Sequence, residues 1–340
     1  TGRFRNAFAW RLALTRTMVP GHEQRRERRA EADPGPLVAP ERIDVRPSYL
    51  PFGSEPRSLT LMGLLRSNSG LGQAARSSFE ALESLGRDFS VFDTTDQYLS
   101  RNTSDPGLDR HALGAFGDVN LIHANAAEFA HRLGLFHHRI AGRYNVAMWF
   151  WEGAQIPRDY MPAFDVVDEL WLASEYLADV FGQYGRVPVR VVGLTAELPE
   201  LRASTKADAG FSEDEFTFLF VYDAQSVPNR KNPELAVKAF IDAFSPAFDG
   251  VRLVLKVHNL HKFPDSERRL REAEAAHDAI TIVDDFLPRR TMLDMMQHAD
   301  AYVSLHAAEG YGLTLLEAMA LGTPVIATGF SGNKDFTTAA

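Results

Sequence analysis

Two glutamates lie eight residues apart in the stretch "AAEGYGLTLLEAMALGTPVIAT", which spans residues 307–328. Glu309 precedes the glycine pair Gly310 and Gly312, and Glu317 falls in the second turn of the helix predicted to follow. A helix start offers free N–H groups to an anion such as phosphate. Carboxylates do not coordinate phosphate, but they accept hydrogen bonds from the vicinal hydroxyls of sugars. The stretch therefore predicts a ligand with sugar hydroxyls on both sides of a diphosphate.

A basic pair is placed to neutralise such a diphosphate. Arg230 and Lys231 follow a predicted buried strand and precede a helix with Asn232 as its expected N-cap. Ligands of α/β sheets bind at the carboxyl ends of the strands, and the loops of Arg230 and Glu309 are both predicted there. Lys256, on the strand "LVLKVH", is a further candidate cation.

Each of these features also has a structural alternative. Glu317 would then be an exposed helix residue, and Glu309 would interact with the helix dipole. An arginine–lysine pair is often a solvated surface feature, and the sequence alone leaves that alternative open for Arg230 and Lys231.

The elements that must position these residues alternate between strand and helix in both halves of the chain. The first half is predicted to hold strands 58–65, 88–93, 118–125, 144–151 and 187–193 with helices 70–86 and 175–185. The second half is predicted to hold strands 216–223, 252–258, 279–286, 301–306 and 324–328 with helices 232–244, 266–277, 289–299 and 313–321. We therefore expect an α/β fold of two doubly wound, Rossmann-like domains that face a cleft.

Two domains are predicted, residues 58–195 and residues 196–340; the family resemblance described next implies that the first is the acceptor-side domain and the second the nucleotide-sugar-binding domain. A basic and proline-rich arm, residues 1–57, precedes them. The chain stops just after a predicted strand, so we expect the C-terminal domain to be incomplete.

Several segments resemble one family. "EGYGLTLLEAMALGTPVIA" resembles the E-x7-E element of retaining GT-B glycosyltransferases of the glycosyltransferase family 4 (group 1) type. "RKNPELAVKAF" resembles the phosphate-binding loop of that family, and "SGLGQAARSSFEAL" resembles its N-domain glycine-rich loop. "MWFWE" and "VDELWLASEYLADVF" are similar to a subgroup associated with surface polysaccharide assembly. The resemblance implies a retaining hexosyltransferase that moves a sugar from a nucleoside-diphosphate sugar to a saccharide or lipid-linked acceptor.

The resemblance also implies roles for individual residues. Glu309 would hold hydroxyls of the donor sugar and Glu317 those of the ribose. Arg230 and Lys231 would stabilise the departing nucleoside diphosphate, with Lys256 as a further donor-binding residue. Backbone N–H groups would be offered to phosphate and sugar by Gly310, Tyr311 and Gly312.

The glycine-rich segment supports a rival interpretation. Gly70, Gly72 and Ala75 make a passable dinucleotide fingerprint, and Asp93 ends the next predicted strand at the spacing of a ribose-binding acid. These residues would suit an NAD-dependent oxidoreductase. However, the residues "RSNS" separate the strand from the first glycine, and the E-x7-E half would stay unexplained. In a transferase, Gly70 and Gly72 would bring the backbone against the donor phosphates or the acceptor.

Further candidates follow two strands of the first half. The resemblance implies that His123 contacts the donor sugar near the reacting carbon, with Asn125 beside it on the acceptor side; the alternative is a structural histidine. Trp149, Trp151 and Glu152 could form an acceptor platform, because aromatic rings pack on the apolar face of a sugar; core packing is the alternative. Arg230, Lys231, Glu309 and His123 form the predicted catalytic set.

No D-x-D element occurs in the chain, and the basic pair in its place favours metal-independent transfer without a cofactor. Asp284-Asp285 and His258 with His261 lack a persuasive metal-ligand spacing. Two further functions stay open: a nucleotide-sugar epimerase of the same fold and a non-catalytic sugar-nucleotide-binding module.

Composition limits the location and the partners. The net charge of -9 argues against nucleic acid as the main partner, and the absence of cysteine fits a reducing compartment such as the cytoplasm. No apolar run reaches the length of a membrane-spanning helix. Residues 1–31 hold eight arginines and three glutamates, so this arm could contact the inner face of a membrane peripherally; a solvated helix is the alternative.

Overall fold

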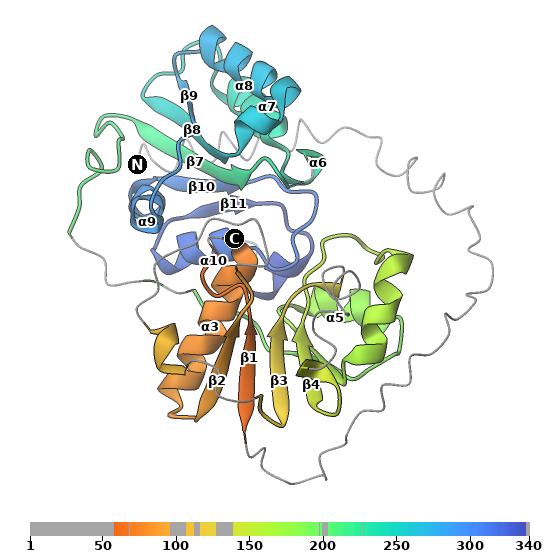
Figure 1. The fold of residues 1–340 in the computed structure, drawn as a ribbon. Coiled ribbons are helices and arrows are strands. Elements are labelled where there is room, and N and C mark those ends of the chain that lie inside the picture. The colour runs from red at the N-terminus through yellow and green to blue at the C-terminus, as the bar shows by residue number, and fades with distance from the viewer. Residues whose placement is uncertain are drawn as a thin grey trace, which may run out of the picture. The chain divides into compact units, whose positions relative to one another are not determined.

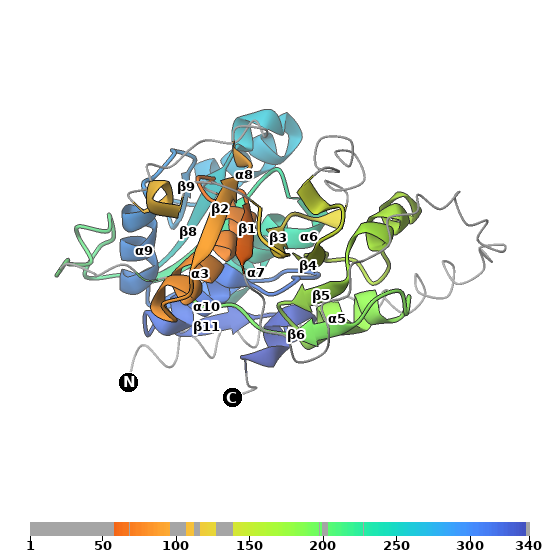
Figure 2. The same cartoon turned by 60° about the horizontal axis from the view of Figure 1, so that its bottom comes forward.

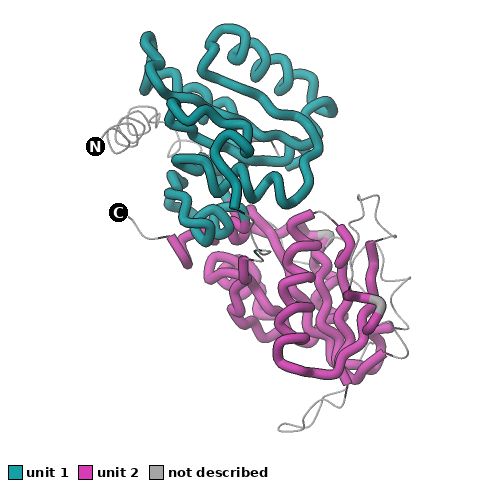
Figure 3. The backbone as a smooth tube through the Cα atoms, turned by 90° about the vertical axis from the view of Figure 1, so that its left-hand side faces the viewer, with its two compact units in different colours: residues 1–38, 198–308, 314–330 teal, residues 39–197, 309–313, 331–340 magenta. Residues whose placement is uncertain are grey.

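Alternating strands and helices form two parallel sheets in a computed structural model, which describes residues 58–67, 69–95, 107–111, 116–126, 139–196, 198, 203–226 and 228–337. The predicted basic and proline-rich arm, residues 1–57, lies outside the described residues. The backbone divides into two compact units, coloured separately in Figure 3. Among the described residues, unit 1 comprises 198, 203–226, 228–308 and 314–330, and unit 2 comprises the described residues of 58–196 together with 309–313 and 331–337.

Unit 2 is built on a six-stranded sheet in the order β2-β1-β3-β4-β5-β6 (Figure 1), and its strand pairs are parallel. The strands are β1 (Leu59–Gly63), β2 (Phe89–Asp93), β3 (Val119–His123), β4 (Tyr144–Met148), β5 (Glu169–Leu172) and β6 (Val189–Val191). The helices are α3 (Gly70–Ser84) and α5 (Glu175–Gly182), with 3-10 turns η2 (Leu108–His111), η3 (Arg158–Val166) and η5 (Gly332–Asp335). Figure 2 shows α5 beside β5 and β6, which it connects.

The register of this sheet aligns the carboxyl ends of three strands. Gly63 of β1 pairs with Asp93 of β2 on one side and with His123 of β3 on the other. A Cβ on Gly63 would lie 2.9 Å from the Cβ of His123. The missing side chain at this position therefore leaves the space that the His123 side chain occupies.

Unit 1 is built on a five-stranded parallel sheet in the order β11-β10-β7-β8-β9 (Figure 1). The strands are β7 (Phe216–Asp223), β8 (Val251–His258), β9 (Ile280–Val283), β10 (Ala301–Ser304) and β11 (Val325–Ala327). The helices are α6 (Pro228–Lys231), α7 (Pro233–Phe244), α8 (Pro264–Ala276), α9 (Arg289–His298) and α10 (Leu313–Ala320), with the 3-10 turn η4 (Leu260–Lys262). The strand order steps away from β7 in both directions, which is the doubly wound arrangement.

The strand β7 runs through the hydrophobic core of unit 1. Its sequence, "FTFLFVYD", is apolar at consecutive positions, as is typical of a parallel strand buried on both faces. Phe218 and Phe220 are buried, and Phe218 packs edge-on against Phe240 of α7. Full burial of one such ring contributes about 1.5–3 kcal/mol, so this cluster fixes the strand from which the basic loop departs.

The predicted α/β class is confirmed, and the bounds of β7 are those predicted. The strand β5 was not predicted, because its four residues begin with a glutamate, a residue depleted in strands. Glu169 is buried there by a polar cluster, in which its carboxylate accepts hydrogen bonds from the Tyr144 hydroxyl (2.9 Å) and the Trp171 indole (2.8 Å).

Candidate functional site

The backbone of Glu309 is fixed on both sides. Its N–H donates to Ser331 Oγ (2.7 Å), and its carbonyl accepts from the Gly332 N–H (2.9 Å). Ser331 has φ 72° and ψ -148°, a region that non-glycine residues rarely adopt and that costs about 1–3 kcal/mol. The side chain of Glu309 is largely buried. The carboxylate is therefore carried by a backbone that the strained Ser331 and its neighbour Gly332 hold in place.

The glycine that follows Glu309 is held by a helix cap. Ser174 precedes α5 and accepts a hydrogen bond from Leu177 N (3.2 Å), which makes it the N-cap of that helix. The same hydroxyl donates to the carbonyl of Gly310 (2.7 Å). A Cβ on Gly332 would lie 2.1 Å from the Gly310 carbonyl oxygen, so only glycine fits there. One serine thus connects the start of α5 with the predicted ligand-binding loop.

Tyr311 and Gly312 complete this loop within unit 2. The Tyr311 hydroxyl donates to the carbonyl of Leu194 (3.1 Å), and its ring is almost completely buried. Gly312 has φ 99°, which a side chain would strain. These two residues shape the backbone ahead of α10, as the sequence indicates, but their predicted contact with phosphate or sugar stays a prediction.

The basic loop of unit 1 is hydrogen-bonded to the segment after β10. The carbonyl of Arg230 accepts from the Ala307 N–H (2.7 Å), and Arg230 Nη1 donates to the carbonyl of Ala308 (3.3 Å). Lys231 ends the short helix α6 beside it. The loops predicted to lie at one edge of the sheet are therefore joined, at the residue directly before Glu309.

Asn232 has a different role from the one predicted. It occupies the N-cap position of α7, but with a left-handed φ of 53° it makes no capping hydrogen bond through its side chain. Its amide instead donates to the carbonyl of Leu305 (2.9 Å), directly after β10. Asn232, the expected cap, thus forms a further hydrogen bond between the basic loop and the segment after β10.

Glu317 is buried, and its carboxylate forms a two-pronged ion pair with Arg289. Arg289 Nη2 lies 2.5 Å from Oε1, and Nη1 lies 3.0 Å from Oε2. Only 3% of the Glu317 side chain is exposed, compared with 38% of the Arg289 side chain. The exposed-helix alternative for Glu317 is therefore wrong. Arg289 was not predicted, because a partner 28 residues away on another helix leaves no local pattern.

Lys256 is buried in the middle of β8. Its ammonium donates to the carbonyl of Val257 (3.0 Å). Burial lowers the pKa of Lys256, and the carboxylates of Asp284, Asp285 and Asp223 oppose that shift. A charged lysine at this position is thus balanced by acidic side chains at the carboxyl ends of the two neighbouring strands, β7 and β9, and its predicted role in donor binding stays a prediction.

His123 is completely buried at the end of β3. Its Nε2 lies 3.0 Å from Ser78 Oγ of α3, while its Nδ1 has no hydrogen-bond partner among the residues that the structure describes. Burial lowers the pKa of His123 to about 4, so the imidazole is neutral near pH 7. A neutral ring can exchange hydrogen bonds with a hydroxyl, which fits the predicted contact with a donor sugar.

The buried histidine predicts a specific pH dependence of stability. The unfolded chain binds a proton at His123 below about pH 6.5, whereas the folded chain does so only near pH 4. Stability is therefore lost as pH falls between these values, by about 3 kcal/mol from this group. We expect His123→Asn to lack this component when urea unfolding is followed from pH 7 to pH 4. The exposed His261→Asn should retain it, and parallel profiles of wild type and His123→Asn would contradict the prediction.

The predicted acceptor residues lie in different environments. Trp149 is completely buried, where its ring packs against Phe164 and Phe181. Its assignment to an acceptor platform is corrected to core packing, because the position directly after β4 points into the apolar interior of unit 2.

Trp151 stays partly exposed, and its indole donates to the carbonyl of Gln155 (2.8 Å). The Glu152 carbonyl accepts from the Tyr176 hydroxyl (2.8 Å), and Asn125 Oδ1 accepts from the Phe150 N–H (2.8 Å). Asn125 thereby links the segments after β3 and β4. A contact of Trp151, Glu152 or Asn125 with an acceptor stays a prediction.

The glycine-rich segment has a structural role, because it packs closely against the loop after β1. A Cβ on Gly72 would lie 2.3 Å from the carbonyl oxygen of Ser67, whereas a Cβ on Gly70 would meet open space. Asp93 accepts from Leu65 N (3.1 Å) and from the Thr95 hydroxyl (2.6 Å), so it holds the loop after β1. This use of the carboxylate weighs against the ribose-binding acid that an oxidoreductase requires.

Neither a metal-binding cluster nor a helix able to cross a membrane occurs in the described ranges. No group of three or more histidine, aspartate or glutamate side chains in these ranges is arranged to hold a metal ion. None of the helices there has both the length and the apolar character needed to cross a bilayer. Metal-independent transfer and peripheral membrane contact stay predictions.

The carboxyl-terminal part of the chain is similar to a known family. Residues 202–340 match the family model described as "Glycosyl transferases group 1". Alpha-monoglucosyldiacylglycerol synthase of Streptococcus pneumoniae is 28% identical over 173 residues, which make up 48% of this chain and 38% of that protein. The chain thus spans well under half the length of this curated relative.

Solved structures share the fold at low identity. Sucrose-phosphate synthase of Thermosynechococcus elongatus superposes with a TM-score of 0.62 at 17% identity, covering 81% of this chain and 82% of that one. Anabaena HepE in complex with UDP-glucose superposes with a TM-score of 0.59 at 12% identity, covering 83% of each chain. The predicted GT-B fold and the resemblance to group 1 are confirmed, whereas family 4 and the retaining mechanism stay predictions. Residues 202–340 are therefore similar to the glycosyl transferases group 1 family, and the chain has the GT-B fold.

Proposed function

We propose that this chain is a retaining glycosyltransferase that uses a nucleoside-diphosphate sugar. The observation that carries the proposal is the hydrogen bonding of the basic loop to the segment that follows β10. Arg230 hydrogen-bonds to Ala307 and Ala308, directly before Glu309, and Glu317 is held as a buried carboxylate on the helix that follows. Cations and hydroxyl-accepting carboxylates at one strand edge match the chemistry of a sugar nucleotide.

The departing group would be stabilised by charge. As the bond from the sugar to the diphosphate lengthens, negative charge develops on the phosphate oxygens, and Arg230 and Lys231 would offset it. Glu317 would accept hydrogen bonds from the ribose hydroxyls, and Glu309 would accept hydrogen bonds from hydroxyls of the transferred sugar. In retaining transfer, the acceptor hydroxyl replaces the diphosphate on the same face of the sugar. The proposal therefore assigns no residue as a covalent nucleophile.

The acceptor is proposed to be a saccharide or a lipid-linked saccharide, as in surface polysaccharide or glycoconjugate assembly. The curated relative is named as a monoglucosyldiacylglycerol synthase, which makes a lipid acceptor worth testing beside saccharides. The partly exposed Trp151 would offer its ring to the apolar face of an acceptor sugar.

Nucleotide-sugar binding and turnover test the proposal together. The purified chain would be screened by thermal shift against UDP-, GDP- and ADP-sugars, and then assayed with saccharide acceptors and with diacylglycerol vesicles. We expect one nucleotide class to raise the melting temperature and nucleoside diphosphate to be released only when acceptor is present. Isomerisation of the donor without acceptor would support the epimerase instead. Binding without turnover in the full-length protein would support the non-catalytic module.

A further inference from the structure

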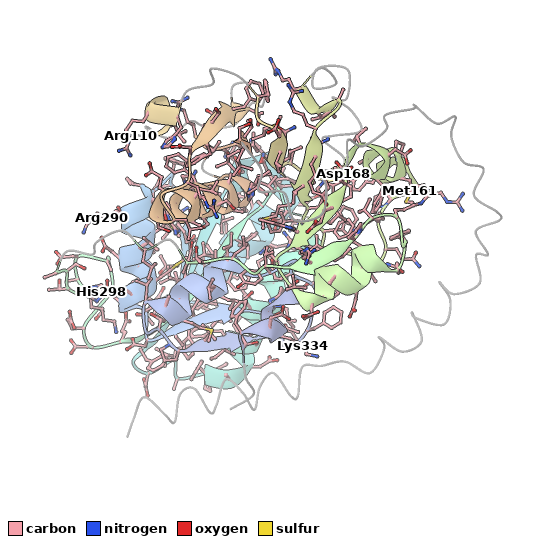
Figure 4. The ribbon with its side chains drawn as sticks, turned by 90° about the horizontal axis from the view of Figure 1, so that it is seen from below. Arg110, Met161, Asp168, Arg290, His298 and Lys334 are labelled. Atoms are coloured by element: carbon pink, nitrogen blue, oxygen red, sulfur yellow. The ribbon has the colours of Figure 1, made fainter. Side chains whose placement is uncertain are left out.

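We propose that Arg289 is a positioning residue of the nucleotide site, whose guanidinium orients the carboxylate of Glu317 toward ribose hydroxyls. This inference rests on the proposed function, because it takes Glu317 as the ribose-binding group. Arg289 is the first residue of α9, the helix on which Figure 4 labels Arg290 and His298. Its contact with α10 lies within unit 1, among residues that the structure describes.

The geometry of the pair is that of a fork on a carboxylate. Each terminal nitrogen of Arg289 lies within hydrogen-bond distance of a different oxygen of Glu317, at 2.5 and 3.0 Å. Two such parallel bonds fix the plane of the carboxylate as well as its position. A lysine ammonium is a single point charge, so it would leave the carboxylate free to rotate.

The carboxylate keeps acceptor capacity in this arrangement. A glutamate carboxylate has about four lone-pair sites, and the fork occupies one on each oxygen. The remaining lone pairs can accept hydrogen bonds from the two neighbouring hydroxyls of a ribose. The guanidinium of Arg289 holds the Glu317 side chain in one orientation before the nucleotide arrives. Binding therefore loses less conformational entropy at this side chain, which raises the affinity.

Burial makes a partner necessary. Only 3% of the Glu317 side chain is exposed, and an isolated charge at such a site is costly. Arg289 itself is 38% exposed, so its own charge keeps contact with water. The pair therefore places the carboxylate of Glu317 on α10 with a partner whose guanidinium keeps contact with water.

The test measures nucleotide affinity by calorimetry in wild type, Arg289→Met, Arg289→Lys, Glu317→Gln and the double variant Arg289→Met/Glu317→Gln. The probe is whichever of UDP, GDP and ADP binds the wild type. We expect at least tenfold weaker binding for Arg289→Met, an intermediate loss for Arg289→Lys, and no further loss when Arg289→Met is added to Glu317→Gln. Arg268→Met removes the same charge from an exposed ion pair on α8 and should leave affinity unchanged.

The possible results distinguish a failure of the positioning role of Arg289 from a failure of the proposed glycosyltransferase function. If the wild type binds a nucleoside diphosphate and Arg289→Met binds it equally or more tightly, the positioning role is overturned while the function stands. Additive losses in the double variant would overturn it as well, because the arginine would then act independently of Glu317. If the wild type binds none of the three nucleotides, the proposed function fails and the inference with it. Arg289→Lys keeps the charge, so it provides the comparison if Arg289→Met does not fold.

Discussion

Glu309→Gln is expected to lower the turnover number of sugar transfer by about a hundredfold or more while leaving the melting temperature within about 2 °C of wild type. The change removes a charge but keeps the shape of the side chain. Two hydrogen bonds that hold this residue use its backbone N–H and carbonyl, and the substitution leaves these two in place. Removing one preorganised electrostatic contact at a reacting centre typically costs 10²–10³ in rate.

The measurement is steady-state release of nucleoside diphosphate with saturating acceptor, together with thermal unfolding. Glu272→Gln is the matched control, because it makes the same change in an exposed ion pair with Arg268 on α8 and should retain full activity. A Glu309→Gln variant with wild-type turnover would contradict the assignment of Glu309 to the donor sugar. A variant with a much lower melting temperature would instead indicate a structural role for the carboxylate.

Much of the fold was predictable because the strands of unit 1 are continuous apolar runs. The "FTFLFVYD" run of β7 can only be a buried strand at that length, and its bounds are those observed. β5 escaped prediction because Glu169 interrupts the apolar pattern. Its burial depends on Tyr144 and Trp171, of which Tyr144 belongs to a different strand. A local pattern does not reveal a compensation that comes from another element.

In the candidate site, too, some residues could be predicted from local sequence and others could not. The placement of Glu309 and Arg230 after strands was predictable, because glycines and charges that follow an apolar run are visible in sequence. Their supports were not, since Ser174 and Arg289 lie far along the chain from the groups they hold. Trp149 illustrates the reverse error: an aromatic residue after a strand can belong to a site or to the core, and only its packing on Phe164 and Phe181 decides.

Gly332→Ala is expected to disturb the Glu309 loop more than any change of a charged side chain around it. The new Cβ would lie 2.1 Å from the Gly310 carbonyl oxygen and 2.9 Å from Ser174 Oγ. No rotamer relieves a contact with backbone, so the loop must move or the Ser174–Gly310 hydrogen bond must break. Overpacking of this kind costs about 1–3 kcal/mol.

Activity should respond more steeply than stability to this substitution, because a shift of about 1 Å in a catalytic group can cost 10²-fold in rate. We therefore expect Gly332→Ala to lose about a hundredfold in turnover with a modest fall in the melting temperature. Gly329→Ala is the matched control, since a Cβ there would meet no atom within 4 Å. Equal turnover in the two alanine variants would mean that the position of the Glu309 loop does not limit transfer. A selective loss in Gly332→Ala would tie the rate to a contact between two backbone segments that no charged residue takes part in.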